Sequence, residues 1–308
     1  MKIFITGICG FIGHNIAVYL YSKGYEILGI DNFKHISSRA LKVLKSLGIK
    51  IYRTDIRNYE RIKYIIKDVD VVIHTAAYVD VQESFEKPLL YIDNNVMGTA
   101  SLLSACTKSD VKRIIYLSSA AVYGEPIKLP ISENHVTKPI SPYGASKLAG
   151  EILIEAFSKA YGFEYIILRL FNVYGPGQED TPYAGVITKF ISRICKNKPP
   201  IIYGDGEQTR DFIHVLDVAR AIELSINTKH CNQVFNIGTG KPTSIKYLAF
   251  IISKLIGKEY RPIFKHRRQG DIRHSYADIS KAITFLGFAP KIQLINGLRE
   301  LIRDVCKE

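Results

Sequence analysis

The chain has 308 residues, enough to bury a large core as one large domain or two modest ones. Hydrophobic residues make up 47% and charged residues 23%, which is typical of a soluble globular protein, and no apolar run approaches the ~20 residues that a membrane-spanning helix needs. The net charge of +13 comes from dispersed Lys and Arg residues, which favours a solvated basic surface over a nucleic-acid partner. Without a recognisable signal peptide, we expect a cytoplasmic protein with no membrane partner.

The first half of the chain alternates short apolar runs with longer amphipathic stretches. Strands alternating with helices at this spacing predict an α/β fold, in which a parallel sheet is covered on both faces in the doubly wound, or Rossmann, arrangement. The predicted strands are 2–6, 26–30, 49–53, 69–74, 113–118 and 164–170, and the predicted helices lie near 13–23, 38–47, 58–67, 88–109 and 143–161.

After about residue 171 the pattern becomes irregular, with Gly/Pro loops at 175–185 and 197–206. Helices are predicted near 184–196, 216–227, 244–256 and 278–286, joined by short strands such as 234–237. This pattern predicts a smaller α/β lobe partly interleaved with the first. We expect a Rossmann domain over 1–171, with a returning segment near 207–228, and a substrate-binding lobe over 172–308.

Five cysteines, Cys9, Cys106, Cys195, Cys231 and Cys306, are spread along the chain. Their number is odd and no two of them form a Cys-x-x-Cys pair, so neither a disulfide framework nor a zinc site is expected. The prediction is five small buried or half-exposed thiols and no bound metal.

A glycine-rich turn follows the first predicted strand directly. Gly7, Gly10 and Gly13, in G-I-C-G-F-I-G, open the first helix, where backbone N–H groups can approach a pyrophosphate. The second strand ends in Asp31, 18 positions past Gly13, where a carboxylate can hold the ribose hydroxyls of NAD and repel the extra phosphate of NADP. Lys34 and Arg39 temper that preference. We predict a site for NAD, with Phe11 and Ile12 inside the turn.

Ser119, Tyr143 and Lys147 supply the chemistry of a proton-abstracting site. An unperturbed tyrosine, with a pKa of about 10, is a poor base at neutral pH. A lysine four residues later lies on the same helix face, and its charge favours the phenolate, while a serine hydroxyl can hold the substrate oxygen. The trio can remove a proton from an alcohol while a hydride leaves the same carbon.

Together these motifs resemble the extended short-chain dehydrogenase/reductase family, specifically its NAD-dependent nucleotide-sugar epimerases and dehydratases. The similarity runs over essentially the whole chain, and its specificity comes from the order of the motifs. Besides the glycine turn and the Tyr/Lys pair, the matching pieces are Asp31-Asn32, Asp55-Ile56, H-T-A-A at 74–77, N-N-V-M-G-T at 94–99, S-S-A-A-V-Y-G at 118–124, L-R-L-F-N-V-Y-G-P at 168–176, T-R-D-F-I-H-V-L-D-V at 209–218, N-I-G-T-G at 236–240 and R-Q-G-D-I-R-H-S at 268–275.

The resemblance implies roles for residues on the cofactor side. Asp55 and Ile56 would flank the adenine, Ala76 would lie along the cofactor, and Lys147 would also hold the nicotinamide ribose. Asn32 and Asn95 belong to the motifs that contact NAD. His74 and Asn236 we expect to be structural, as satisfied polar groups beneath the loops.

On the substrate side, the resemblance implies contacts to the diphosphate and uridine of a UDP-sugar from Asn172, Arg210, Arg268 and Asp271. Arginine suits this task because its planar fork matches phosphate oxygens. Val79 departs from some relatives, which have a lysine near the phosphate.

Three chemistries in this family begin with oxidation at carbon 4 of the sugar. A dehydratase carries an Asp-Glu pair directly after the catalytic hydroxyl, but here Ala120 and Ala121 follow Ser119, and a methyl group can neither donate nor accept a proton. The resemblance therefore implies a UDP-hexose 4-epimerase. The alternatives left open are a UDP-glucuronate epimerase or decarboxylase, and a noncatalytic NAD-binding scaffold.

Two finer expectations also rest on the resemblance. Ser275 stands where a large tyrosine closes the sugar pocket in the epimerases restricted to plain hexoses, so UDP-GlcNAc and UDP-GalNAc should be accepted beside UDP-Glc and UDP-Gal. A homodimer is expected through the helices near 88–109 and 143–161. Candidate interface residues are Leu102, Leu103, Leu148, Ile152 and Leu153, although the same stripe could instead face the sheet.

Overall fold

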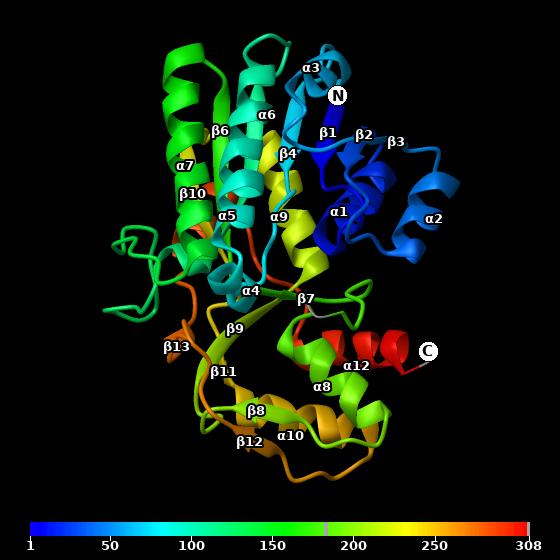
Figure 1. Ribbon diagram of the computed structural model, residues 1–308, viewed down its shortest axis with the longest axis vertical. Coiled ribbons are helices and arrows are strands. Elements are labelled where there is room, and N and C mark those ends of the chain that lie inside the picture. Colours follow the sequence, from blue (N-terminus) through cyan, green and yellow to red (C-terminus); the bar gives the residue numbers. More distant parts are fainter. Residues whose placement is uncertain (182–183, 307–308) are drawn as a thin grey trace.

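The computed structural model describes residues 1–181 and 184–306. Its centre is a seven-stranded parallel sheet with helices on both faces (Figure 1). The six strands predicted from the first half are all present, and the doubly wound α/β fold is confirmed. In spatial order the strands are β10 (Gln233–Ile237), β6 (Glu164–Leu170), β5 (Arg113–Ser119), β4 (Val71–His74), β1 (Lys2–Thr6), β2 (Glu26–Asp31) and β3 (Lys50–Arg53).

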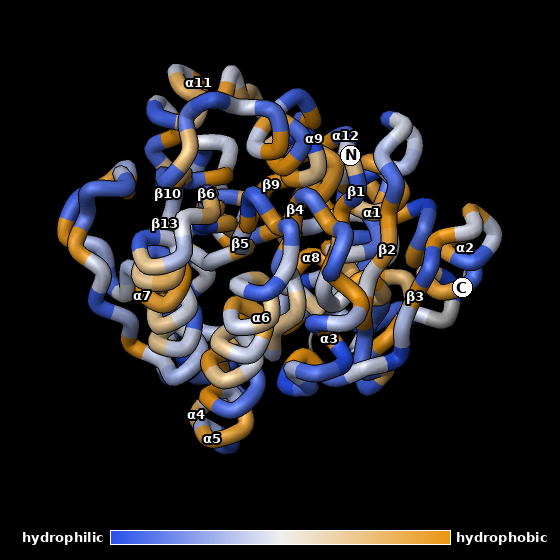
Figure 2. The backbone as a smooth tube through the Cα atoms, turned by 90° about the horizontal axis from the view of Figure 1, so that it is seen from above, coloured by the Kyte–Doolittle hydropathy of each residue, from blue (hydrophilic) through white to orange (hydrophobic). Residues whose placement is uncertain are grey.

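The helices divide between the two faces of this sheet, and each face has its own apolar core. Seen from above, α6 and α7 lie on one side of the row of strands, and α9 and α11 lie on the other (Figure 2). The first face carries α3 (Tyr59–Ile65), α6 (Gly98–Cys106) and α7 (Pro142–Tyr161), and the second carries α1 (Phe11–Ser22), α2 (Ser38–Ser46), α9 (Val215–Asn227) and α11 (Ser280–Leu286).

The helix predicted over 88–109 is built from three pieces. They are α5 (Pro88–Tyr91), the π-helical turn η1 (Ile92–Met97) and α6; the short helix α4 (Val81–Glu86) precedes them. Leu102 and Leu103 are fully buried against the sheet, so these two candidate interface residues were assigned wrongly, and the alternative, a stripe facing the sheet, holds for them. Ile152, on α7, is 59% exposed.

Strand β10 lies elsewhere than the sequence pattern suggested. It was grouped with the second lobe, but it pairs with β6 at the edge of the large sheet. Its side chains explain this, because Phe235 and Ile237 pack into the core on one face while Val234 packs into the core on the other, as a strand covered on both faces requires. The chain thus leaves for the second lobe after β6 and returns through α9.

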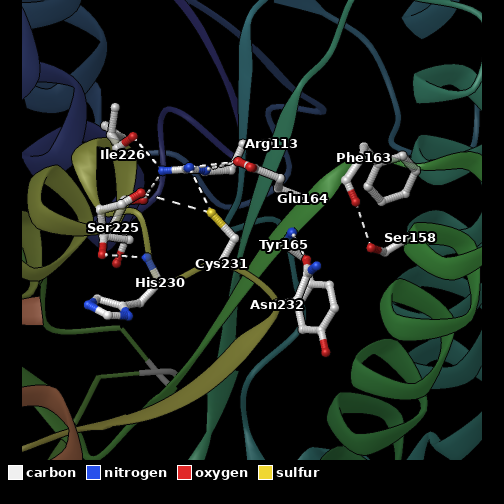
Figure 3. Close-up of polar contacts among 11 residues, drawn as sticks. Arg113, Ser158, Phe163, Glu164, Tyr165, Ser225, Ile226, His230, Cys231 and Asn232 are labelled. Carbon is white, nitrogen blue, oxygen red and sulfur yellow. Dashed lines mark hydrogen bonds and ion pairs between the residues drawn. The ribbon is translucent and has the colours of Figure 1, made fainter. Parts of the chain in front are cut away.

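Arg113, at the start of β5, fastens that returning segment to the sheet (Figure 3). Its guanidinium donates to the carbonyls of Ser225 and Ile226 in the last turn of α9, at 2.9 and 2.6 Å. The same group donates twice to the Glu164 carboxylate and once to the sulfur of Cys231. A cation at a helix C-terminus also interacts favourably with the helix dipole. This cluster lies at the amino ends of the strands, away from the carboxyl ends where ligands bind in such sheets.

The second lobe contains two small sheets and a third apolar core. The core is formed chiefly by three helices, whose buried side chains include Phe190, Leu248 and Leu301. The lobe's elements are β7 (Asn172–Tyr174), α8 (Val186–Cys195), β8 (Ile201–Tyr203), β9 (Thr209–His214), β11 (Pro242–Ser244), α10 (Ile245–Ile256), β12 (Ile263–Lys265), β13 (His274–Ser275) and α12 (Leu294–Val305).

Two features of this lobe differ from expectation. The pattern analysis assigned no helix to the C-terminal region, where α12 lies. Cys195 and Cys306 form a disulfide with their Cα atoms 5.8 Å apart, so the prediction of five free thiols is wrong for this pair. Spacing along the chain could not show it, because 111 positions separate two cysteines that meet only when α12 packs beside α8. None of the described helices has the length and apolar character to span a membrane.

Candidate functional site

A cavity of about 570 Å³ opens at the carboxyl ends of β1, β2 and β4. Its lining includes nine of the residues predicted to hold the cofactor, one of them Ile56. The other eight are Gly7, Gly10, Phe11, Ile12, Gly13, Asp31, Asn32 and Ala76.

The backbone of the glycine turn packs so closely that only glycine fits at Gly7 and Gly13. Gly7 has φ +64°, and a Cβ on it would lie 2.9 Å from the Cα of Ala76. A Cβ on Gly13 would lie 2.2 Å from the carbonyl oxygen of Gly7. Helix α1 starts after Gly10, and no side chain caps that helix start. Its first N–H groups and its dipole are therefore available to an anion, and the turn fits the pyrophosphate of a dinucleotide.

Asp31, at the end of β2, is buttressed by backbone donors. Its two carboxylate oxygens accept from the N–H groups of Cys9 and Phe33, at 3.0 and 2.9 Å. Burial raises the pKa of Asp31, and these backbone hydrogen bonds oppose the rise. Burial and the nearby Asp31 carboxylate raise the pKa of Cys9 to about 12, so that thiol stays protonated and packs beside the turn.

The far end of the cavity departs in part from expectation. Ile56 lines it, whereas Asp55 lies outside the lining and pairs with Arg57. Asn94 lines the cavity in place of the predicted Asn95. Asn95 is buried, and its amide bonds to the backbone of Tyr78 and the hydroxyl of Ser146, so it supports the wall. The sequence did not distinguish these two adjacent asparagines.

Helix α7 brings the predicted catalytic side chains into register. The Ser141 hydroxyl accepts from the N–H of Gly144 as the N-cap, Pro142 occupies the first turn, and the helix runs for 20 residues. Tyr143 and Lys147 lie one turn apart on it. Ser119 ends β5, and its hydroxyl accepts from the N–H of Ala121 at 3.1 Å.

The electrostatics of this group are set by burial and by specific partners. Burial raises the pKa of Tyr143, and a hydrogen bond with Ser119 opposes the rise. Burial lowers the pKa of Lys147 to about 7, and the charge of Glu151 partly offsets this. The Lys147 ammonium also lies 4.2 Å from the centroid of the Tyr116 ring, within range of a cation–π interaction. A small change in charge near Lys147 would therefore change its protonation at neutral pH.

Behind Lys147 lies a buried ion pair. Glu151, one turn further along α7, pairs with Arg169 of β6 at 2.7 Å, and both side chains are less than a tenth exposed. Ser118, next to Ser119, donates to the same carboxylate at 2.5 Å. Arg169 also donates to the Tyr123 hydroxyl, which in turn donates to Asn236. Sequence reasoning did not identify Glu151 or Arg169, although Glu151 follows Tyr143 and Lys147 at the same spacing of four.

His74 has two hydroxyl neighbours in the core between the sheet and α6. Its ring nitrogens lie 2.8 Å from the Thr6 hydroxyl and 2.9 Å from that of Thr99. Burial, and secondarily the charge of Lys147, lowers the pKa of His74 to about 3, so the ring is neutral. Asn236 donates its amide to the carbonyls of Ile131 and Asp278.

The predicted substrate residues other than Ser119, which ends β5, lie in the second lobe. Arg210 forms an ion pair with Asp271 at 3.1 Å, and Ser275 pairs with Arg210 between β13 and β9. Asn172, on neighbouring β7, donates its amide to the carbonyl of Asp211. The Arg268 guanidinium stacks 3.6 Å from the centroid of the Tyr203 ring. Asn172, Arg210 and Asp271 are therefore held at one small sheet, and Arg268 contacts a strand of the other.

Two neighbours of Arg268 were not predicted. Lys189, on α8, has a pKa lowered by burial and next by the charge of Arg268. Arg267 donates to the carbonyl of Asp271 and lines a second, more open cavity with Tyr203 and Phe264. No motif marked Lys189, because it sits in an ordinary amphipathic helix and comes close to Arg268 only in the folded lobe.

Comparisons with known proteins agree with this geometry. The pattern of the NAD dependent epimerase/dehydratase family matches residues 3–238. A putative UDP-glucose 4-epimerase of Methanocaldococcus jannaschii is 42% identical over 97% of each chain. The structure of UDP-N-acetylglucosamine 4-epimerase from Methanobrevibacter ruminantium M1, in complex with UDP-N-acetylmuramic acid, superposes with a TM-score of 0.94 at 37% identity over 99% of this chain and 98% of that one.

A third similar protein is UDP-glucuronic acid 4-epimerase from Bacillus cereus, solved with UDP-glucuronic acid and NAD. Its TM-score is 0.92 at 34% identity, over 100% of this chain and 99% of that one. These matches span nearly the whole chain, and the glycine cradle fits the dinucleotide that the family uses. The chain belongs to the NAD-dependent epimerase/dehydratase family, and NAD is its cofactor.

Proposed function

We propose that the protein is a UDP-hexose 4-epimerase that uses bound NAD and proceeds through a 4-keto sugar. The observation that carries the proposal is the group formed by Ser119, Tyr143 and Lys147 at the carboxyl end of the sheet, with alanines at 120 and 121. NAD would supply the hydride acceptor and donor. The 3-10 turn η2 (Ala120–Val122) offers no acid or base for eliminating water.

In this proposal Tyr143 takes the proton of the sugar 4-hydroxyl, and Ser119 holds the same oxygen. Lys147 favours the phenolate through its charge and holds the nicotinamide ribose. The ketone then turns within the site, and its other face is reduced. As the hydride returns to carbon 4, Tyr143 gives its proton back to the sugar 4-oxygen, so the overall reaction is redox-neutral.

Epimerisation requires a firm hold on the nucleotide and a loose hold on the sugar. Arg210, Arg268, Asp271 and Asn172 are assigned to contacts with the diphosphate and uridine. Asp271 also orients Arg210 through their ion pair. Lys189 and Arg267 extend this cationic group, because their charges lie close to Arg268 and Asp271 respectively. The glycine turn, Asp31 and Asn32 would hold NAD. Asp55 and Asn95 would support the cavity wall instead, Asp55 by its ion pair with Arg57 and Asn95 by its hydrogen bond with the backbone of Tyr78.

The substrate range is the part of the proposal with a direct rival. Related proteins act on UDP-glucose, UDP-N-acetylglucosamine and UDP-glucuronate, and an epimerase for the last needs a group that accepts the sugar carboxylate. We favour neutral hexoses and their 2-acetamido forms, because the small, buried Ser275 stands at the proposed sugar wall. A coupled assay with UDP-Glc, UDP-Gal, UDP-GlcNAc, UDP-GalNAc and UDP-glucuronate tests this. Turnover of UDP-glucuronate alone would replace our assignment with the rival.

Replacing Ser275 with tyrosine should narrow the substrate range. A bulky ring at this wall leaves less room for an acetamido group, so kcat/KM for UDP-GalNAc should fall at least about tenfold more than kcat/KM for UDP-Gal. Ser275→Ala is the matched control, since it removes the hydroxyl without adding volume. Thermal melting checks that Ser275→Tyr folds. Equal losses on both substrates in a folded variant would show that Ser275 is not at the sugar wall.

We also propose a homodimer through the outer face of α5, η1 and α7. Leu89, Ile92, Met97 and Ile152 expose apolar side chains on this face, with Leu89 81% exposed. Ile152→Lys should convert a dimer to a monomer in light scattering, because it places a charge in an apolar contact. Tyr64→Lys changes an exposed residue on α3 and should leave the mass unchanged. A monomeric wild-type protein would refute this interface.

A further inference from the structure

Part of the NAD cavity wall comes from a loop of the second lobe. Gly177, Gln178, Glu179 and Thr181 line the same cavity as the glycine turn. The loop touches α1, since Asn15 donates to the carbonyl of Pro176 at 3.1 Å. Gly177 has φ +84°, and a Cβ there would lie 2.6 Å from the His14 ring, so the backbone approaches the first helix closely. A dinucleotide bound in this cavity would therefore lie against the loop as well as against the glycine turn.

Helix α8 holds this loop from one side. The Thr188 hydroxyl donates to the side-chain oxygen of Gln178 at 2.8 Å. Ser192, one turn later, donates to the Asp180 carboxylate, and Lys196 reaches the same carboxylate at 3.3 Å. Three successive turns of one helix region therefore anchor the loop.

Helix α12 holds the loop from the other side through Asp304. One carboxylate oxygen accepts from the N–H of Gly177 at 3.2 Å, and the other forms an ion pair with Arg39 of α2. Asp304 is thus a link between the loop, the last helix and a helix of the NAD-binding sheet. Its side chain is 18% exposed, so these bonds are only partly open to water.

The two anchoring helices are joined to each other beside these contacts. Cys195 is next to Lys196, and Cys306 lies two positions after Asp304. The disulfide between them fixes the end of α12 to the end of α8. Without that bond, the last turn of α12 would be held by packing and by the two contacts of Asp304 alone.

We propose that Asp304 is a positioning residue for NAD and that the Cys195–Cys306 disulfide strengthens its hold on the 177–181 loop. The loop then acts as a clasp that slows loss of NAD. Formation of the bond removes two protons and two electrons from the two protein thiols. A low-molecular-weight disulfide such as oxidised glutathione accepts them and is reduced to two molecules of thiol. The inference depends on NAD binding and is independent of which UDP-sugar is the substrate.

The test measures how fast bound NAD is lost from the full chain. Purified protein is loaded with NAD and passed into NAD-free buffer, and the NAD remaining is measured over time. Asp304→Ala should lose NAD about tenfold faster, because it removes a charge-assisted hydrogen bond and an ion pair. Arg303→Ala, an exposed neighbour on the same helix, is the control. Equal rates in these two variants would overturn the role of Asp304.

The disulfide is tested in the same experiment. Protein oxidised by glutathione disulfide, with the Cys195–Cys306 bond verified by peptide mass, should retain NAD several-fold longer than the reduced protein. Cys306→Ser should behave like the reduced protein under both conditions, and Cys231→Ser should behave like the wild type. Retention that is unaffected by the thiol state would overturn this part.

Local measurements separate positioning from general destabilisation. In Asp304→Ala, backbone hydrogen exchange at 177–181 should accelerate while the melting temperature of the NAD-free protein stays within a few degrees of the Arg303→Ala control. With saturating NAD, kcat should return to the wild-type value. A large fall in the melting temperature with no local change in exchange would assign Asp304 to overall stability instead.

Discussion

Tyr143→Phe should lose at least about a hundredfold in kcat, since a positioned general base contributes on the order of 10² to 10⁴ and no other described group replaces it here. The change deletes one oxygen and leaves the ring, which packs edge-on against Tyr91 at 6.4 Å between centroids. NAD content should be unaffected, because the phenylalanine keeps the ring, and the glycine turn and Asp31, which line the NAD cavity, are unchanged. The measurement is turnover of UDP-Gal with bound NAD determined on the same sample.

The matched control for this variant is Tyr161→Phe. Tyr161 lies at the other end of α7 and is 60% exposed, so the same atom is removed from the same helix far from the site. Tyr161→Phe should retain wild-type activity. If Tyr143→Phe kept activity within tenfold of that control, another group would have to be the base, and the proposed chemistry would be wrong.

Several parts of the site were predictable because residue type and spacing within one short segment are enough to indicate them. The glycine turn is fixed by close approach, and Gly13 tolerates no Cβ beside the carbonyl of Gly7. Asp31 ends a strand, and Tyr143 and Lys147 share a helix face, so spacing along the chain is enough to place each of them. The six strands of the first half were likewise readable from their apolar runs.

The parts that sequence reasoning missed depend on contacts between distant segments. Arg169 reaches Glu151 only because β6 and α7 pack together, and Lys189 reaches Arg268 only within the folded lobe. Helix α12 is different. Its Leu294, Leu298, Leu301, Ile302 and Val305 recur at the helical period, so that pattern could have revealed it. Exposure was also mispredicted for Leu102 and Leu103, since an apolar helix stripe does not say whether it faces a sheet or a partner.

The second large effect is expected at Glu151, which the sequence did not mark. Glu151→Gln leaves Arg169 buried without its charge partner, and removing one member of a buried pair costs about 3–5 kcal/mol in the free energy of unfolding. Glu155→Gln is the control, because Glu155 is one turn further along α7 and exposed. Urea denaturation of the two variants measures the difference.

The same variant should alter the pH dependence of catalysis. Glu151 raises the pKa of Lys147, which burial holds at about 7, so removing the carboxylate must lower that pKa. Less of Lys147 then carries a charge at neutral pH, and less of Tyr143 is favoured as phenolate. The alkaline limb of the kcat profile, where Lys147 loses its proton, should therefore move to lower pH in Glu151→Gln and stay in place in Glu155→Gln.

A double variant separates the two roles of Glu151. Glu151→Leu with Arg169→Met replaces the pair by apolar side chains, and such replacements are often neutral or stabilising. Stability should recover while the shifted pH profile persists, because the carboxylate that favours charged Lys147 is still missing. Stability also has a pH dependence of known sign. Lys147 has a folded-state pKa of about 7 against 10.5 for the free side chain, so between these values the unfolded chain holds the extra proton and this residue makes stability rise with pH. A double variant with a wild-type kcat profile would show that Glu151 serves stability alone and does not tune the catalytic lysine.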